Sequence, residues 1–97
     1  MDKMLHVTMP DGSVWGVPVY IIARNRAEHY SHEFDFDVER SLQEDTLPAF
    51  EDDYEITDWA EGHMNWEDVE KYAFLVKPAP TDSDFQEGWC NGDKEVV

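Results

Sequence analysis

The sequence predicts a small α+β domain, in which an N-terminal β-hairpin and a third strand combine with about three helices in the order β-β-α-α-α-β. Two β-prone runs flank a turn signal near the N-terminus, apolar residues then recur with helical spacing, and a third β-prone run follows. A length of 97 residues suits one domain with one modest core. Aromatic residues make up 13% of the chain and lie between the acidic ones, which argues against acidic disorder because disordered segments lack such side chains.

The hairpin is predicted from two short runs near the N-terminus. Leu5 and Val7 alternate with polar residues, and a second β-prone run occupies residues 14–17. Asp11 and Gly12 lie between these runs, and an Asp-Gly pair is typical of tight hairpin turns because those turns need positive φ. We therefore expect two antiparallel strands at the start of the chain.

Two helices are predicted after the hairpin. The first begins at Pro18, whose missing N–H is harmless at a helix start, and its apolar residues recur at three- and four-residue spacing up to Phe34. The second covers about residues 37–45. It is expected to stop before Pro48, because a proline disfavours helical backbone in the residue that precedes it.

A third helix and a third strand complete the predicted domain. Asp53 can cap the helix, and Gly62 suits the positive φ at its C-terminal end. Residues 65–68 resemble the capping box of a further helical start, with acidic residues in the first turn where the helix dipole favours them. Residues 74–77 are expected to form the third strand.

The domain is predicted to cover residues 1–80, and residues 81–97 are predicted to form a loosely attached polar tail. This last stretch is polar and contains glycine. Phe85 and Trp89 are its candidate anchors to the domain.

Acidic side chains dominate the chain. It has 23 Asp and Glu against 7 Lys and Arg, a formal net charge of −16. Between Glu33 and Glu70, fifteen acidic residues accompany a single base, Arg40. Solubility needs a net charge of only about 2–8 in a small domain, so we expect the excess to attract a strongly basic protein partner. The same field repels phosphates, which excludes direct nucleic-acid binding and disfavours an anionic membrane.

The sequence predicts a cytoplasmic protein. Cys90 is the single cysteine, so no internal disulfide can form, and this favours a reducing compartment. No run approaches the roughly 18 apolar residues of a membrane span. The N-terminus lacks the basic start and apolar core of a signal peptide. We expect a monomer that contacts no membrane.

Candidate metal ligands lack the required pattern. His29 and His32 lie beside acidic residues, yet a zinc site needs three or four converging ligands. The run from Asp35 resembles the start of a calcium loop, but Arg40 stands where that loop needs glycine and Thr46 where it needs glutamate. Because nucleophile-elbow and phosphate-loop motifs are also missing, we expect no metal, no cofactor and no enzymatic activity.

The acidic residues can instead imitate a strand of phosphates. Carboxylates three or four positions apart on a helix are about 4.5–6 Å apart along its axis. Duplex DNA carries one charge per roughly 3.4 Å of axis within one strand. We therefore predict that two acidic rows bind the partner: Asp35, Asp37, Glu39, Glu44 and Asp45 in one, and Glu51, Asp52, Asp53, Glu55 and Asp58, continued by Glu61, in the other. The alternative is an acidic face that is merely solvated.

Several segments resemble a family of small acidic proteins of phages and prophages. They are residues 9–15 (MPDGSVW), 22–27 (IARNRA), 53–56 (DYEI), 58–60 (DWA) and 64–69 (MNWEDV), and the likeness covers residues 4–76. Some members of comparable size and acidity are anti-CRISPR proteins that mimic DNA and act on the type I-F surveillance complex, also called Csy or Cascade.

The resemblance implies that this chain binds the large subunit of that complex, where it grips the PAM-proximal duplex, and so blocks target DNA. It assigns no functional residue, so the two acidic rows rest on the charge pattern alone. Two alternatives stay open. The chain is a DNA mimic directed at a restriction enzyme, a nuclease or a histone-like protein, or it is a phage accessory protein whose charge confers only solubility.

Overall fold

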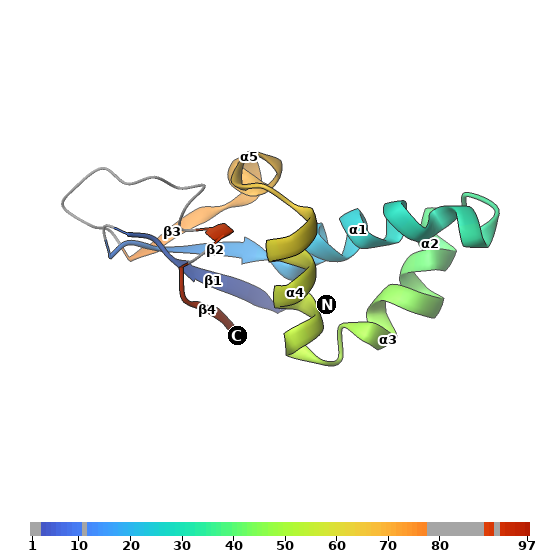
Figure 1. The fold of residues 1–97 in the computed structure, drawn as a ribbon, viewed down its shortest axis with the longest axis horizontal. Coiled ribbons are helices and arrows are strands. Elements are labelled where there is room, and N and C mark those ends of the chain that lie inside the picture. The colour runs from blue at the N-terminus through green and yellow to red at the C-terminus, as the bar shows by residue number, and fades with distance from the viewer. Residues whose placement is uncertain (1–2, 11, 78–88, 91) are drawn as a thin grey trace.

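The computed structural model describes residues 3–10, 12–77, 89–90 and 92–97. They form an elongated α+β domain of 47 × 21 × 19 Å, with a four-stranded antiparallel sheet at one end and helices that extend beyond it (Figure 1). The predicted fold class is confirmed. Among the described residues, no helix has both the length and the apolar character that a membrane crossing requires.

The sheet has the strand order β3-β2-β1-β4. Its strands are β1 (Met4–Thr8), β2 (Val14–Pro18), β3 (Phe74–Lys77) and β4 (Lys94–Val96). The predicted hairpin is confirmed, because β1 and β2 pair in antiparallel register from Met4 opposite Pro18 to Thr8 opposite Val14. Gly12 has a φ of 88°, which is the left-handed backbone that the turn signal predicted.

The expected loose tail is wrong for the described residues near the C-terminus. The β4 strand pairs with β1, so it forms the edge of the sheet opposite β3. Trp89 is fully buried, and its indole N–H donates to the backbone carbonyls of Ala60 and Met64, each at 3.0 Å. Trp89 is therefore an anchor, as its residue type suggested, and it fixes this end of the chain to the helices. Phe85 lies outside the described residues.

The helical elements occupy the centre of the chain. They are α1 (Val19–Tyr30), η1 (Ser31–Phe34), α2 (Val38–Ser41), η2 (Leu42–Thr46), α3 (Leu47–Ala49), α4 (Asp53–His63), α5 (Trp66–Val69) and η3 (Glu70–Tyr72). The α1 and η1 segments cover the first predicted helix, and α4 corresponds to the third. Its predicted caps are wrong: the N-cap is Asp52 and not Asp53, and the helix continues through Gly62, which has no positive φ, to His63. The predicted capping box is present at the start of α5, where Asn65 and Asp68 bond reciprocally.

The second predicted helix does not stop before Pro48. It runs through α2, η2 and α3 to Ala49, and η2 is a π-helical segment in which the Leu47 N–H bonds to the Leu42 carbonyl five residues back. A proline inside a regular α-helix removes one hydrogen bond and crowds the carbonyl four residues earlier. The wider π turn relieves that conflict just before Pro48, so the helical path continues.

One face of the sheet carries the core. Leu5, Val7 and Val17 point from the strands to this face, and all three are fully buried. They join Ile22 of α1 and Ile56 of α4 in a single apolar cluster. The sheet and these two helices therefore form the two layers between which the core lies.

Candidate protein-interaction surface

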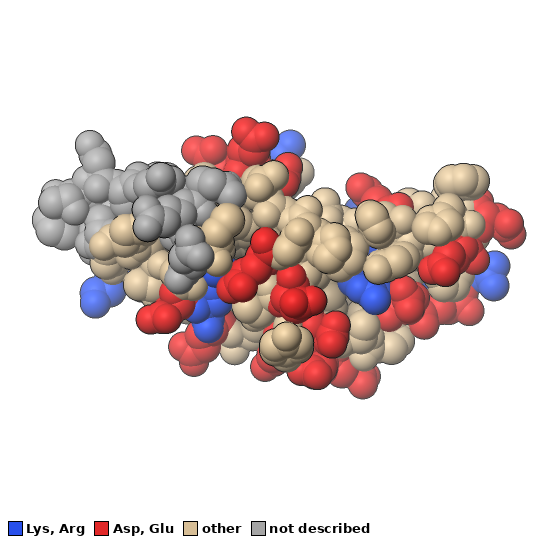
Figure 2. All heavy atoms as spheres, in the orientation of Figure 1, with Lys and Arg blue, Asp and Glu red and all other residues tan. Residues whose placement is uncertain are grey.

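The α4 helix holds one acidic row on a fixed outer face. Ile56, Trp59 and Ala60 are buried on its inner side, so the carboxylates of Glu55 and Asp58 point to solvent. The helix has one buried and one exposed side because its apolar residues recur at three- and four-residue spacing, which places them on the same face. Figure 2 shows acidic side chains gathered over the middle of this face, where α4 runs.

The start of α4 is itself acidic. Asp52 is the N-cap, and its carboxylate accepts the Tyr54 N–H at 3.0 Å. Asp53 and Glu55 occupy the first turn, where the positive end of the helix dipole favours negative charge. The dipole and the cap therefore offset part of the repulsion among these carboxylates.

The other acidic row is less regular than predicted. Asp37 caps α2 by accepting the Arg40 N–H at 3.1 Å, and Glu39 accepts a hydrogen bond from the Gln43 side chain. Asp35 precedes this helix in a left-handed turn. The first three acids of the row are therefore exposed at the end of the molecule, before the helix and in its first turn.

Three of the ten predicted residues have their charge compensated within the protein. Asp53 pairs with Lys3 at 2.9 Å, and Glu44 pairs with Arg40 one turn earlier. Asp45 pairs with Arg26 at 2.8 Å.

Arg26 is largely buried, with a side chain only 16% exposed, and it lies over the rings of Tyr30 and Trp59. Its pair with Asp45 therefore joins the π-helical segment to α1. Asp45 therefore contributes to the stability of the fold, and the partner-binding role of Asp45 stays a prediction.

The other seven predicted residues point to solvent without such compensation. Within the described part of the chain, no cation lies at ion-pair distance from Asp35, Asp37, Glu39, Glu51, Asp52, Glu55 or Asp58. Glu61, at the far end of the α4 row, pairs with Lys94 at 3.0 Å and so connects α4 to β4. The structure thus separates a solvent-facing acidic surface, made of these seven residues, from acids that hold the fold together.

The α4 row has a spacing comparable with that of phosphates. Asp52, Glu55 and Asp58 follow one another at three-residue intervals, which corresponds to a rise of about 4.5 Å for each step. One strand of duplex DNA carries a charge every 3.4 Å or so along the axis. A groove lined with Lys and Arg would meet a charge density about three-quarters of that of a phosphate strand.

Two of the four histidines, His29 and His63, form an aromatic cluster with Trp59. His63 stacks on Trp59 with ring centroids 3.8 Å apart, and His29 meets the Trp59 ring edge-on at 5.3 Å. Sequence reasoning missed this contact because the two histidines are distant in the chain. Among the described residues, no group of three or more His, Cys, Asp or Glu is placed to hold a metal ion.

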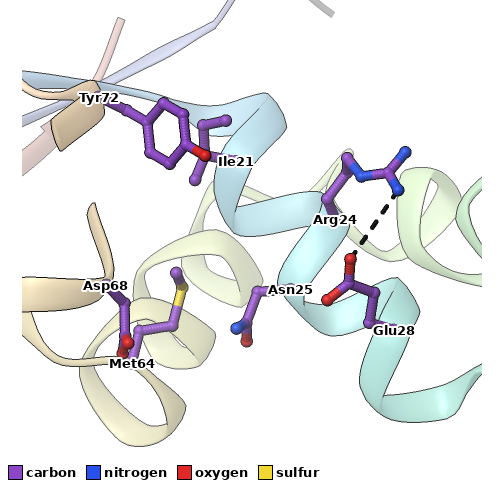
Figure 3. Close-up of a pocket in the computed structure, with 7 residues that line it drawn as sticks. All are labelled: Ile21, Arg24, Asn25, Glu28, Met64, Asp68 and Tyr72. Carbon is purple, nitrogen blue, oxygen red and sulfur yellow. Dashed lines mark ion pairs between the residues drawn. The ribbon is translucent and has the colours of Figure 1, made fainter.

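A hollow of about 240 Å³ lies beside α1, between that helix and the α5–η3 segment (Figure 3). Glu28 and Asp68 lie on opposite sides of it, and Arg24 lies at its edge with its guanidinium 3.8 Å from Glu28. A hydrogen bond to Tyr20 is the main reason why the pKa of Arg24 is raised above its ordinary value. The hollow combines both signs of charge, so it extends the polar surface without forming an apolar ligand pocket.

Two exposed aromatic residues lie within the acidic surface. Tyr54 stands on the outer side of α4, and Phe36 lies between Asp35 and Asp37. Sequence reasoning used both only as signs of a folded core. Phe36 did carry a signal, because it falls outside the apolar spacing that ends at Phe34.

Comparisons with known proteins give no family for this chain: no family model, no curated protein and no solved structure matches it.

Proposed function

We propose that this chain is a non-enzymatic inhibitor that presents a DNA-like acidic surface to the basic duplex-binding groove of a type I-F CRISPR surveillance complex. It would act in the cytoplasm of a bacterial host, on the large subunit that recognises the PAM-proximal duplex. Binding there would exclude target DNA by occupying the same cationic groove, and opposite potentials would speed the association.

The solvent-facing acidic surface is the observation that carries this proposal. Glu55 and Asp58 stand on a helix whose other side is packed into the core, so the backbone that carries these charges is fixed before any partner arrives. Preorganised charges lose little conformational entropy on binding. A protein that needed only solubility would not require this excess of charge, and partial pairing inside the fold has left the surface strongly negative.

The naming of the type I-F complex depends on the sequence resemblance, whereas the choice of a basic groove depends on the charge geometry. A restriction enzyme, a nuclease or a histone-like protein presents a similar groove, and each would be recognised by the same carboxylates. The experiment must therefore test the groove and the complex separately.

The proposal is tested by competition for duplex DNA. The purified type I-F complex is first mixed with the protein and then offered a labelled duplex that carries the PAM and target. We expect the protein to prevent duplex binding, and a saturating excess of duplex added first to slow binding of the protein. Simultaneous binding with both affinities unchanged would contradict the shared groove. If the protein does not bind this complex but displaces duplex from another host protein, the mimic stands with a different target.

A further inference from the structure

Phe36 projects from the turn that joins η1 to α2. Its side chain is 77% exposed, the largest exposed fraction among the large apolar residues that the structure describes. This turn lies at the end of the molecule remote from the sheet (Figure 1). The ring therefore adds almost nothing to the core, unlike the apolar residues of α1 and α4.

The backbone at this turn is unfavourable for the residues that occupy it. Asp35 and Phe36 have φ values of 56° and 64°, so two consecutive side-chain-bearing residues adopt the left-handed conformation. Asp tolerates that region, but a bulky residue such as Phe is an outlier there because its Cβ crowds the backbone. The turn is held by the Phe36 N–H bonded to the Ser31 carbonyl and the Asp37 N–H bonded to the Phe34 carbonyl. Glycine would make the same turn without this strain.

The surroundings of Phe36 are acidic. Asp35 and Asp37 flank it in sequence, and Glu39 follows in the first turn of α2, all three exposed and without a cation at ion-pair distance in the described chain. The nearby base, Arg40, is paired with Glu44. An apolar ring surrounded by like charges matches the usual anatomy of a protein interface, in which an aromatic anchor lies inside a polar rim.

We propose that Phe36 is an apolar anchor that inserts into a pocket on a basic protein partner, while the surrounding carboxylates pair with Lys and Arg at the rim of that pocket. This inference rests on the proposed function for the identity of the partner. It adds that the contact is not purely electrostatic, so part of the affinity persists when salt screens the charges. A strained, exposed residue at a functional surface lowers stability in return for binding.

Three variants separate the ring from the turn. Phe36→Ala removes the ring and keeps a side chain in the left-handed turn, whereas Phe36→Gly removes the ring and relieves the strain. Asp35→Gly relieves strain at the neighbouring position and keeps the ring, and because it also removes one carboxylate of the acidic surface it serves as a control for stability only. Each variant is assayed by thermal melting, and the two Phe36 variants also by binding to the purified type I-F complex at low and at high salt.

We expect both Phe36 variants to bind the complex roughly tenfold or more weakly than the wild type, with the loss retained at high salt. Phe36→Gly should melt about 4–8 °C above the wild type, and Phe36→Ala should melt close to it. If both Phe36 variants bind like the wild type while Glu55→Lys with Asp58→Lys weakens binding, the anchor is refuted and the proposed function survives. A Phe36→Gly variant that melts lower than the wild type refutes the strained turn.

A wild-type protein that does not bind the complex instead refutes the proposed target. The same variants are then compared on whichever basic protein the wild type displaces from duplex DNA, and undiminished binding by Phe36→Ala to that protein refutes the anchor.

Discussion

Reversing two charges on α4 tests the acidic surface most directly. Glu55 and Asp58 are suitable because both are exposed, neither has a cation at ion-pair distance in the described residues, and neither caps the helix. The variant Glu55→Lys with Asp58→Lys therefore changes the presented field without breaking a contact that the structure records. Reversal of Asp52 would be less clean, because its carboxylate accepts the Tyr54 N–H.

The expected loss of binding follows from the number of altered ion pairs. Each reversal removes one attraction to a partner cation and adds one repulsion, and exposed pairs are worth about 0.2–1 kcal/mol each. Two reversals therefore weaken binding by about 1–4 kcal/mol, which corresponds to a fivefold to several hundredfold loss of affinity.

The fold itself should be little affected by the same two changes. Lysine in the first turn opposes the helix dipole by about 0.3–1 kcal/mol. Relief of repulsion from the neighbouring Asp52 offsets this, because like charges three or four residues apart destabilise a helix by about 0.2–0.5 kcal/mol for each pair. We expect the melting temperature to stay within about 4 °C of the wild type.

Binding is measured by calorimetry or surface plasmon resonance against the purified type I-F complex, beside a control with the same change in net charge. Asp93→Lys with Glu95→Lys is that control. These two residues line a hollow with His6 and Thr8. His6 and Thr8 alternate along β1 with the core-facing Leu5 and Val7, so the hollow lies on the face of the sheet away from the core. We expect the control to bind within about threefold of the wild type. Equal losses in both variants would show that only total charge matters, and unchanged binding in the α4 variant would refute the site.

Three further outcomes are expected. Affinity for the complex should fall by roughly tenfold or more from low to high salt, because the Debye length shrinks from about 30 Å at 0.01 M to 3 Å at 1 M. An affinity that does not change with salt in these titrations would contradict electrostatic recognition. Trp89→Phe should lower the free energy of unfolding by about 1–3 kcal/mol in urea melts, because two buried carbonyls lose their indole donor. An unchanged midpoint would instead support the loosely attached tail that the sequence predicted. Asp45→Asn should destabilise the fold by about 1 kcal/mol because it leaves Arg26 without its carboxylate, while Glu51→Gln, the matched control, should not alter the melting curve.

Patterns between near neighbours were readable in the sequence. The Asp-Gly turn, the apolar spacing of α1 and α4 and the capping box before α5 all depend on residues a few positions apart. Such local preferences act before tertiary contacts form, so they survive in the fold. The expected stop before Pro48 failed because Leu47 keeps helical backbone, with φ −62° and ψ −41°, so the preference against that conformation before a proline was overridden.

The candidate site was only partly readable. Composition indicated that the chain is strongly acidic, but it could not tell which carboxylates would meet a cation. Lys3 and Asp53 are separated by 50 positions and Arg26 and Asp45 by 19, so their pairing depends on how the helices pack. The left-handed turn that exposes Phe36 was equally hidden, because phenylalanine is an unexpected residue there.

The sequence by itself thus determined the class of fold, the first strands and helices, and the size and sign of the charge. Only the tertiary structure decided that β4 pairs with β1, a contact between opposite ends of the chain, and that Trp89 packs into the core against residues 25 and 29 positions away. It also decided which acids remain free to face a partner. The physical reason is the same in each case: a nonlocal contact is set by the packing of the whole chain, and neighbouring residues alone do not specify it.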